Sequence, residues 1–145
     1  MFDLDHCVAF VTNVASKTLS DALNSRLIKH GVTKSQWIAM YYINKKENLT
    51  QKSLADLMGT KESTVTGILD RLEREDLILR QEDINDRRKK ILVLTDKGRL
   101  KNTKLTEIVQ NFRDVCLAGI SEEDQKVFLE ILDKMVVAAT NWKEK

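Results

Sequence analysis

A cluster of basic side chains follows an Asn-Asp pair in the second half of the chain. Asn85 and Asp86 are turn-forming residues, and the next four positions are Arg87, Arg88, Lys89 and Lys90. Short apolar runs flank this segment at 77–79 and 91–94, so the pattern predicts a β hairpin with the cations at its tip. Cations held in this way could reach phosphate groups or a narrow groove.

The helix expected at about 61–75, directly before the hairpin, has two different faces. Its apolar arc is formed by Val65, Ile68, Leu69 and Leu72. The positions opposite and beside this arc are Ser63, Gly67, Asp70, Arg74, Thr60, Thr64, Thr66 and Arg71. Hydroxyl groups can contact base edges and phosphates, and Gly67 permits close approach of the backbone. An ordinary surface helix with an Asp70–Arg74 ion pair is the alternative, but the basic hairpin favours DNA binding.

The composition limits the class of protein. The chain has 145 residues, 42% of them hydrophobic, which is enough for one domain with its own core. It has no proline and five glycines, so we expect it to be mostly helical. Because 24 lysines and arginines face 22 acidic residues, a polyanion-binding surface must be local. No apolar run approaches the roughly 20 residues of a membrane span, and no signal-peptide pattern opens the chain, so we expect a soluble cytoplasmic protein.

Hydrophobic periodicity and capping residues predict the remaining elements. A first helix at about 4–29 is apolar around much of its circumference and ends near Gly31. Thr33 and Gln36 fit a capping box that opens a second helix. Further helices are expected at 51–58, 61–75, 95–117 and from 121 through Trp142. Two helices joined by a tight turn and followed by a hairpin indicate a winged helix-turn-helix, in a chain that is mainly α with a small β wing.

Several motifs in this order strengthen that interpretation. They are Thr50-Gln-Lys-Ser-Leu-Ala-Asp-Leu-Met-Gly59, Ser63-Thr-Val-Thr66, Leu72-Glu73, Asp86-Arg-Arg88 and Leu94-Thr-Asp-Lys-Gly98. In these motifs the chain resembles the MarR family of bacterial transcriptional regulators over its whole length. The resemblance implies a homodimer that binds a near-palindromic operator, with Arg88 in the minor groove and Asp86 holding the shape of the wing. It departs from the family at Asp76, where a glycine is usual, and at Gly67, where a larger side chain is common.

The resemblance also implies a division of the chain and a set of contacts. We expect dimerisation helices at 1–31 and 119–145, a winged helix-turn-helix region at 33–98 and a long linking helix at 95–118. A solvated surface charge is the alternative for each lysine among the expected contacts. The expected DNA-contacting residues are Lys52, Thr60, Lys61, Ser63, Thr64, Thr66, Gly67, Arg71, Asp86, Arg87, Arg88, Lys89 and Lys90.

Regulation is expected to come from a small molecule, with no cofactor. In the family such ligands, often aromatic or anionic, lie between the dimer helices and the winged domain. The residues from the bordering segments are Phe10, Asn13, Trp37, Met40 and Tyr41. Aromatic and methionine side chains at helical spacing are also typical of a core, which is the alternative. The input could then come from elsewhere.

A thiol is one such alternative input. Cys7 falls near the start of the first helix, where the peroxide-sensing branch of the family keeps its reactive cysteine, and Cys116 lies roughly where a second thiol is found. A helix amino terminus favours the thiolate. The other interpretation is two free, buried cysteines in an intracellular protein.

Other classes have weaker support. The two histidines, His6 and His30, form no metal-binding spacing with the cysteines, and a sequence-adjacent Cys7–His6 pair does not make a catalytic dyad. We therefore expect neither an enzyme nor a metal site. A winged-helix module that binds another protein remains an alternative to DNA binding.

Overall fold

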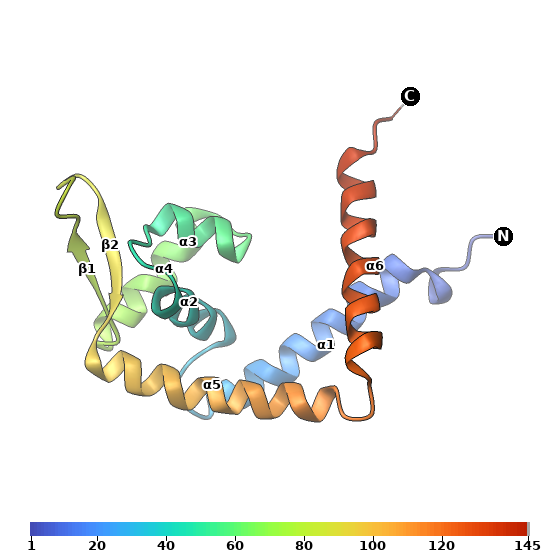
Figure 1. Ribbon diagram of the computed structural model, residues 1–145, viewed down its shortest axis with the longest axis horizontal. Coiled ribbons are helices and arrows are strands. Elements are labelled where there is room, and N and C mark those ends of the chain that lie inside the picture. Colours follow the sequence, from blue (N-terminus) through green and yellow to red (C-terminus); the bar gives the residue numbers. More distant parts are fainter. Residues whose placement is uncertain (145) are drawn as a thin grey trace. The chain divides into compact units, whose positions relative to one another are not determined.

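The computed structural model describes residues 1–144. In chain order the elements are a 3-10 turn η1 (Leu4–His6), α1 (Val8–Ile28), α2 (Lys34–Lys45), α3 (Gln51–Met58), α4 (Glu62–Arg74), β1 (Ile78–Glu82), β2 (Lys90–Leu94), α5 (Asp96–Cys116) and α6 (Glu122–Asn141) (Figure 1). This order confirms a mainly α chain with a small β wing. One compact unit covers Met1–Phe112 and a second begins at Arg113.

Local hydrogen bonds set the ends of the helices as the sequence predicts. The capping box of α2 is present, because Thr33 Oγ1 accepts from the backbone of Gln36 while the Gln36 side chain accepts from the backbone of Thr33. Thr50 caps α3 through the backbone of Ser53, and Gly59 ends it in the left-handed conformation at φ 63°. The backbone of Asp76, just after α4, is also left-handed at φ 59°.

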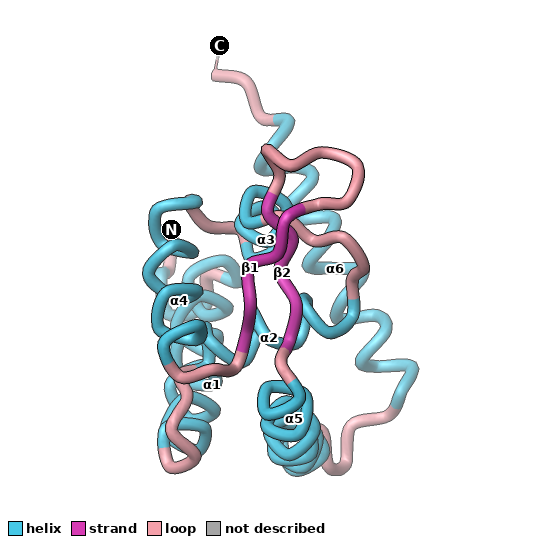
Figure 2. The backbone as a smooth tube through the Cα atoms, turned by 90° about the vertical axis from the view of Figure 1, so that its left-hand side faces the viewer, coloured by secondary structure: helices cyan, strands magenta, loops and turns pink. Residues whose placement is uncertain are grey.

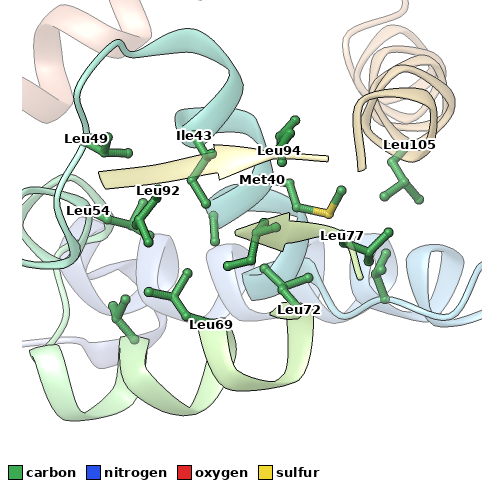
Figure 3. Packing of buried hydrophobic residues seen from close by; sticks show 14 of the residues in the cluster. Met40, Ile43, Leu49, Leu54, Leu69, Leu72, Leu77, Leu92, Leu94 and Leu105 are labelled. Carbon is green, nitrogen blue, oxygen red and sulfur yellow. The ribbon is translucent and has the colours of Figure 1, made fainter. Parts of the chain in front are cut away.

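The hydrophobic core of the first unit joins the helices to the hairpin (Figure 3). Met40, Leu54, Leu69 and Leu72 have no exposed surface, and Ile78 of β1 is equally buried. Around them, Figure 3 shows Ile43, Leu49, Leu77, Leu92, Leu94 and Leu105. Since the strands contribute as much to this core as α4 does, the hairpin packs against α4 instead of being joined to it only through the chain.

The hairpin is longer than its apolar runs. β1 and β2 pair antiparallel over five residues each, with Ile78 opposite Leu94 and Glu82 opposite Lys90 (Figure 2). A bond from the backbone N–H of Leu92 to the carbonyl of Leu49 ties β2 to the segment before α3. The polar outer ends of both strands therefore belong to the sheet, which apolar periodicity alone could not show.

The base of the hairpin is closed by the motif that opens α5. The backbone N–H of Thr95 donates to the carbonyl of Leu77, and the Thr95 hydroxyl donates to the carbonyl of Asp76. Gly98 is buried against the same segment, where a Cβ would lie 1.9 Å from the Leu77 carbonyl oxygen. Glycine is required there because any side chain would collide with backbone.

Two boundary predictions need correction. Residues 4–6 form a 3-10 turn instead of the first turn of α1, and Cys7 is the N-cap residue of α1. The last helix ends at Asn141, so Trp142 is its C-cap residue. The expected start of α6 is confirmed, since Ser121 Oγ accepts from the backbone of Asp124. Among the described residues, no helix is long and apolar enough to cross a membrane.

Substitution of Gly98 by alanine should test the closed base of the hairpin. We expect Gly98→Ala to lower the free energy of unfolding by roughly 1–3 kcal/mol or more, because the new methyl group meets rigid backbone. Gly67→Ala is the matched control: no atom lies within 4 Å of a Cβ at Gly67, and alanine is favoured in a helix by about 0.5–1 kcal/mol. Urea denaturation of both variants measures the difference, and equal stability would contradict the close approach.

Candidate nucleic-acid interface

The predicted faces of α4 are confirmed. Val65, Leu69 and Leu72 are fully buried, while Ser63 and Thr64 are exposed. The expected contact residues Thr66, Gly67 and Arg71 are exposed on the same helix, and Lys52, Thr60 and Lys61 lie on α3 and in the turn before α4. Small polar side chains therefore cover the outer surface of a helix whose other side is anchored in the core.

A side chain that the sequence analysis did not single out connects the two helices of the turn motif. Gln51, the first residue of α3, donates from Nε2 to Thr66 Oγ1 and, at 3.3 Å, to the carbonyl of Glu62. Thr66 in turn donates its hydroxyl to that carbonyl. The amino-terminal ends of α3 and α4 are thus held together at the exposed surface. The one sequence signal for this contact is that Gln51 directly follows Thr50, the N-cap residue of α3.

The wing loop is shaped by carboxylates that accept backbone N–H groups. Asp83 accepts from the backbone of Asn85, and Asp86 accepts from the backbone of Arg88 at 3.0 Å. Asp86 also accepts from Arg88 Nε at 3.1 Å, although the Arg88 side chain is 92% exposed. The loop is therefore ordered around Asp86, while the remaining N–H groups of Arg88 face solvent.

These hydrogen bonds alter the acidity of Asp86. The hydrogen bond from the Arg88 side chain holds the pKa of the Asp86 carboxyl below its ordinary value of 3.8, and the backbone N–H of Arg88 acts in the same direction. Partial desolvation opposes this and the charge of Lys89 adds to it. Asp86 therefore stays ionised, and can hold the loop, over the whole physiological range of pH.

The four-cation tip predicted from the sequence is wrong at one position. Arg87, Arg88 and Lys89 lie in the exposed loop, but Lys90 is the first residue of β2 and its Nζ lies 3.3 Å from a carboxylate oxygen of Glu82. Lys90 is opposite Glu82 in the register, so the cross-strand pair follows from strand geometry. Three cations, rather than four, belong to the loop.

The ion pair considered for α4 is also wrong. Asp70 contacts Arg80 of β1 at 2.8 Å instead of Arg74, and Arg80 reaches Glu73 at 3.2 Å as well. The Arg80 side chain is 22% exposed, whereas those of Asp70 and Glu73 are 50% and 42% exposed, so solvent still reaches the carboxylates. One arginine of the wing thus bridges two carboxylates of α4 and links the two elements.

Comparison with known proteins bears on this arrangement. Residues 32–90, which hold α2 to the start of β2, match the sequence profile of the MarR family. The chain is 27% identical over 116 residues to YwoH of Bacillus subtilis (strain 168), described as an uncharacterized HTH-type transcriptional regulator, covering 80% of this chain and 84% of that protein. Residues 32–90 of this chain belong to the MarR family. The protein is a transcriptional regulator of that family.

Solved structures share the fold over nearly the whole chain. The MepR–DNA complex of S. aureus is similar with a TM-score of 0.85 at 23% identity, covering 94% of this chain and 99% of that one. CouR of Rhodococcus jostii RHA1, bound to p-coumaroyl-CoA, gives a TM-score of 0.83 at 22% identity, with 100% of both chains covered. At these identities the likeness establishes the MarR fold.

The residues expected to line an effector site of this MarR family chain are only partly brought together. The rings of Trp37 and Tyr41 lie with their centroids 5.7 Å apart on half-buried positions of α2. Met40 has no exposed surface and is part of the core, as the alternative interpretation held. Phe10 and Asn13 are exposed on α1. The aromatic pair is thus the part of this set that could offer a surface to a ligand.

The thiols differ from the buried pair considered above. Cys7 is half-buried at the N-cap of α1, and Cys116 is exposed at the end of α5. Both are free. Burial as an explanation for Cys116 is therefore wrong in the single chain, and a redox role for either cysteine stays an untested prediction.

The acidity of Asp86 offers a direct check on the wing. A carboxyl whose pKa is lower in the folded than in the unfolded state stabilises the fold above about pH 4, and this contribution is lost as the pH falls through the folded-state pKa. We expect the Asp86 carboxyl to titrate below 3.8 by carbon-detected NMR, and Arg88→Ala to move its midpoint upward. Arg87→Ala is the control that should leave it in place. An unchanged midpoint in Arg88→Ala would contradict the hydrogen bond.

Proposed function

We propose that the protein acts in the cytoplasm as a homodimer that binds a near-palindromic DNA operator and releases it in response to a small molecule, as a repressor does. The observation that carries the proposal is the placement of two exposed surfaces on one compact unit. The hydroxyl-bearing face of α4 suits the major groove, and the basic loop of the wing lies at the end of a hairpin packed against α4. The MepR structure, which has this fold, was solved with DNA bound.

The two surfaces would contribute different kinds of binding energy. Arg87, Arg88 and Lys89 are exposed cations that can neutralise phosphates or enter the minor groove. Ser63 and Thr64 carry hydroxyls that can donate to or accept from base edges. We therefore assign affinity and salt dependence chiefly to the wing, and base preference chiefly to α4.

Exposed apolar side chains on the terminal helices support the homodimer. On α1 these are Val8, Phe10, Val11, Val14 and Leu19, each at least 40% exposed, and on α6 they are Val127, Phe128, Leu129, Ile131, Val136 and Val137. Surfaces of this kind on a water-soluble chain mark a protein interface. A second copy of the chain is the occupant that also provides a second recognition helix, which a near-palindromic site requires.

An aromatic surface supports a small-molecule effector. Tyr41 lies between the ring of Trp37 and the ammonium group of Lys45, which is 5.4 Å from the Tyr41 centroid. The two rings are inclined at 39° to each other, and an aromatic pair of this kind beside a cation could hold an aromatic, anionic ligand. CouR, which has the same fold, was solved with p-coumaroyl-CoA, whose acyl group is aromatic.

Removal of the Arg88 side chain tests the wing. A duplex selected from a random library by the wild-type protein provides the probe, and fluorescence anisotropy over a salt series measures affinity. We expect Arg88→Ala to weaken binding by about 1–3 kcal/mol and to reduce the salt slope by about one. Ser63→Ala and Thr64→Ala are the matched comparison, since they should mainly relax base preference. Failure of the wild-type protein to select any duplex at physiological salt would instead favour a protein-binding module.

A charge placed on α6 tests the dimer. Ile131→Glu should lose dimerisation and DNA binding together, because a carboxylate buried at an apolar interface without a partner costs several kcal/mol. Leu100→Glu, at a 76%-exposed position on α5, is the control that should remain dimeric. Light scattering measures the mass of each variant, and a wild-type protein that is monomeric at micromolar concentration would remove the proposal.

A further inference from the structure

We propose that Thr66 contributes to operator recognition with its methyl group rather than its hydroxyl, and that it reads the C5 methyl of a thymine. Gln51 is the positioning residue that holds the hydroxyl away from the bases. This inference rests on the proposed DNA binding and assigns a specific kind of base contact to one position of α4.

The hydrogen bonds of Thr66 carry the argument. A threonine hydroxyl offers one donor and two acceptor sites. The donor is used on the carbonyl of Glu62, at 3.0 Å, and one acceptor site is used by the Gln51 side-chain amide. No comparable bond engages the hydroxyls of Ser63 or Thr64 within residues 1–144. Three neighbouring hydroxyls therefore differ in what they can offer to a base edge.

The conformation of the side chain follows from the same bonds. In a helix, threonine chooses between rotamers according to whether its hydroxyl bonds the carbonyl one turn back. Here that bond and the one from Gln51 act together, so they fix the hydroxyl against the backbone. The residue remains exposed, and because the hydroxyl keeps only one free acceptor site and no donor, the methyl is the main group left to meet a base. An exposed methyl on a recognition helix is complementary to the C5 methyl of thymine.

Gln51 belongs to α3 and would affect base recognition only through its hydrogen bond to Thr66 on α4. Its Nε2 also lies 3.3 Å from the Glu62 carbonyl, so the amide bridges α3 to the first turn of α4. Without Gln51, the Thr66 hydroxyl keeps one bond instead of two and its rotamer is less restricted. The predicted consequence is weaker discrimination at one base position, with the fold retained.

Deoxyuridine substitution isolates the methyl contact, because uracil lacks the C5 methyl but keeps the hydrogen-bonding groups of thymine. The probe is a duplex selected from a random library, with each thymine of one half-site replaced in turn. We expect one replacement to weaken binding of the wild-type protein by about fourfold, the value of one buried methyl group. Thr66→Ser lacks the methyl group and should bind the thymine and uracil duplexes equally well. Thr66→Val keeps a methyl group and should still bind the thymine duplex about fourfold more tightly than the uracil duplex.

A second set of variants tests the positioning role. Gln51→Ala should bring the thymine-to-uracil ratio close to one, while Gln110→Ala, an exposed glutamine of α5, should leave it unchanged. Circular dichroism confirms that each variant is folded. The inference is overturned if no replacement affects the wild-type protein, or if Thr66→Ser keeps its discrimination while Thr66→Val loses it. If no duplex is selected at all, the proposed function itself fails.

Discussion

The close approach of Gly98 to Leu77 is the constraint on which the arrangement of the winged unit depends. Leu77 follows the recognition helix and precedes β1, whereas Gly98 lies in the first turn of α5. The start of β1 and the end of β2 therefore lie next to each other. Two hydrogen bonds donated by Thr95, to the carbonyls of Leu77 and Asp76, join them further. This junction fixes the base of the wing relative to the end of α4, and the contacts farther out along the hairpin build on it.

From that base, polar contacts set the direction of the wing. Arg80 lies two residues beyond the first core residue of β1 and reaches back to Asp70 and Glu73 on α4. Farther out, no core is available, and the loop relies on Asp83 and Asp86 as acceptors for its own N–H groups. Packing thus holds the base of the wing, the ion pairs of Arg80 link its middle to α4, and local hydrogen bonds order its loop. The exposed cations lie in this loop, where a polyanion could replace the solvent around them.

The sequence predicted those features that depend on near neighbours. The capping box of Thr33 and Gln36 joins residues three apart, and the helix end expected near Gly31 is a left-handed glycine at φ 81°. Arg80 and Gln51 were missed because their partners lie 10 and 15 residues away, and no local pattern encodes such a pairing. Met40 was ambiguous for a related reason, since helical spacing places a side chain on a face but does not say what covers that face.

The terminal helices raise a different question of stability. No residue of α6 is buried in the described part of the chain, and α1 buries only Leu27. Most helical stability in proteins comes from packing of an apolar face rather than from the isolated helix. If two chains pair as proposed, the interface supplies that packing and the helices fold with assembly. Dimerisation, helix formation and operator affinity would then be linked by mass action, so a ligand that alters the interface could release DNA without touching α4.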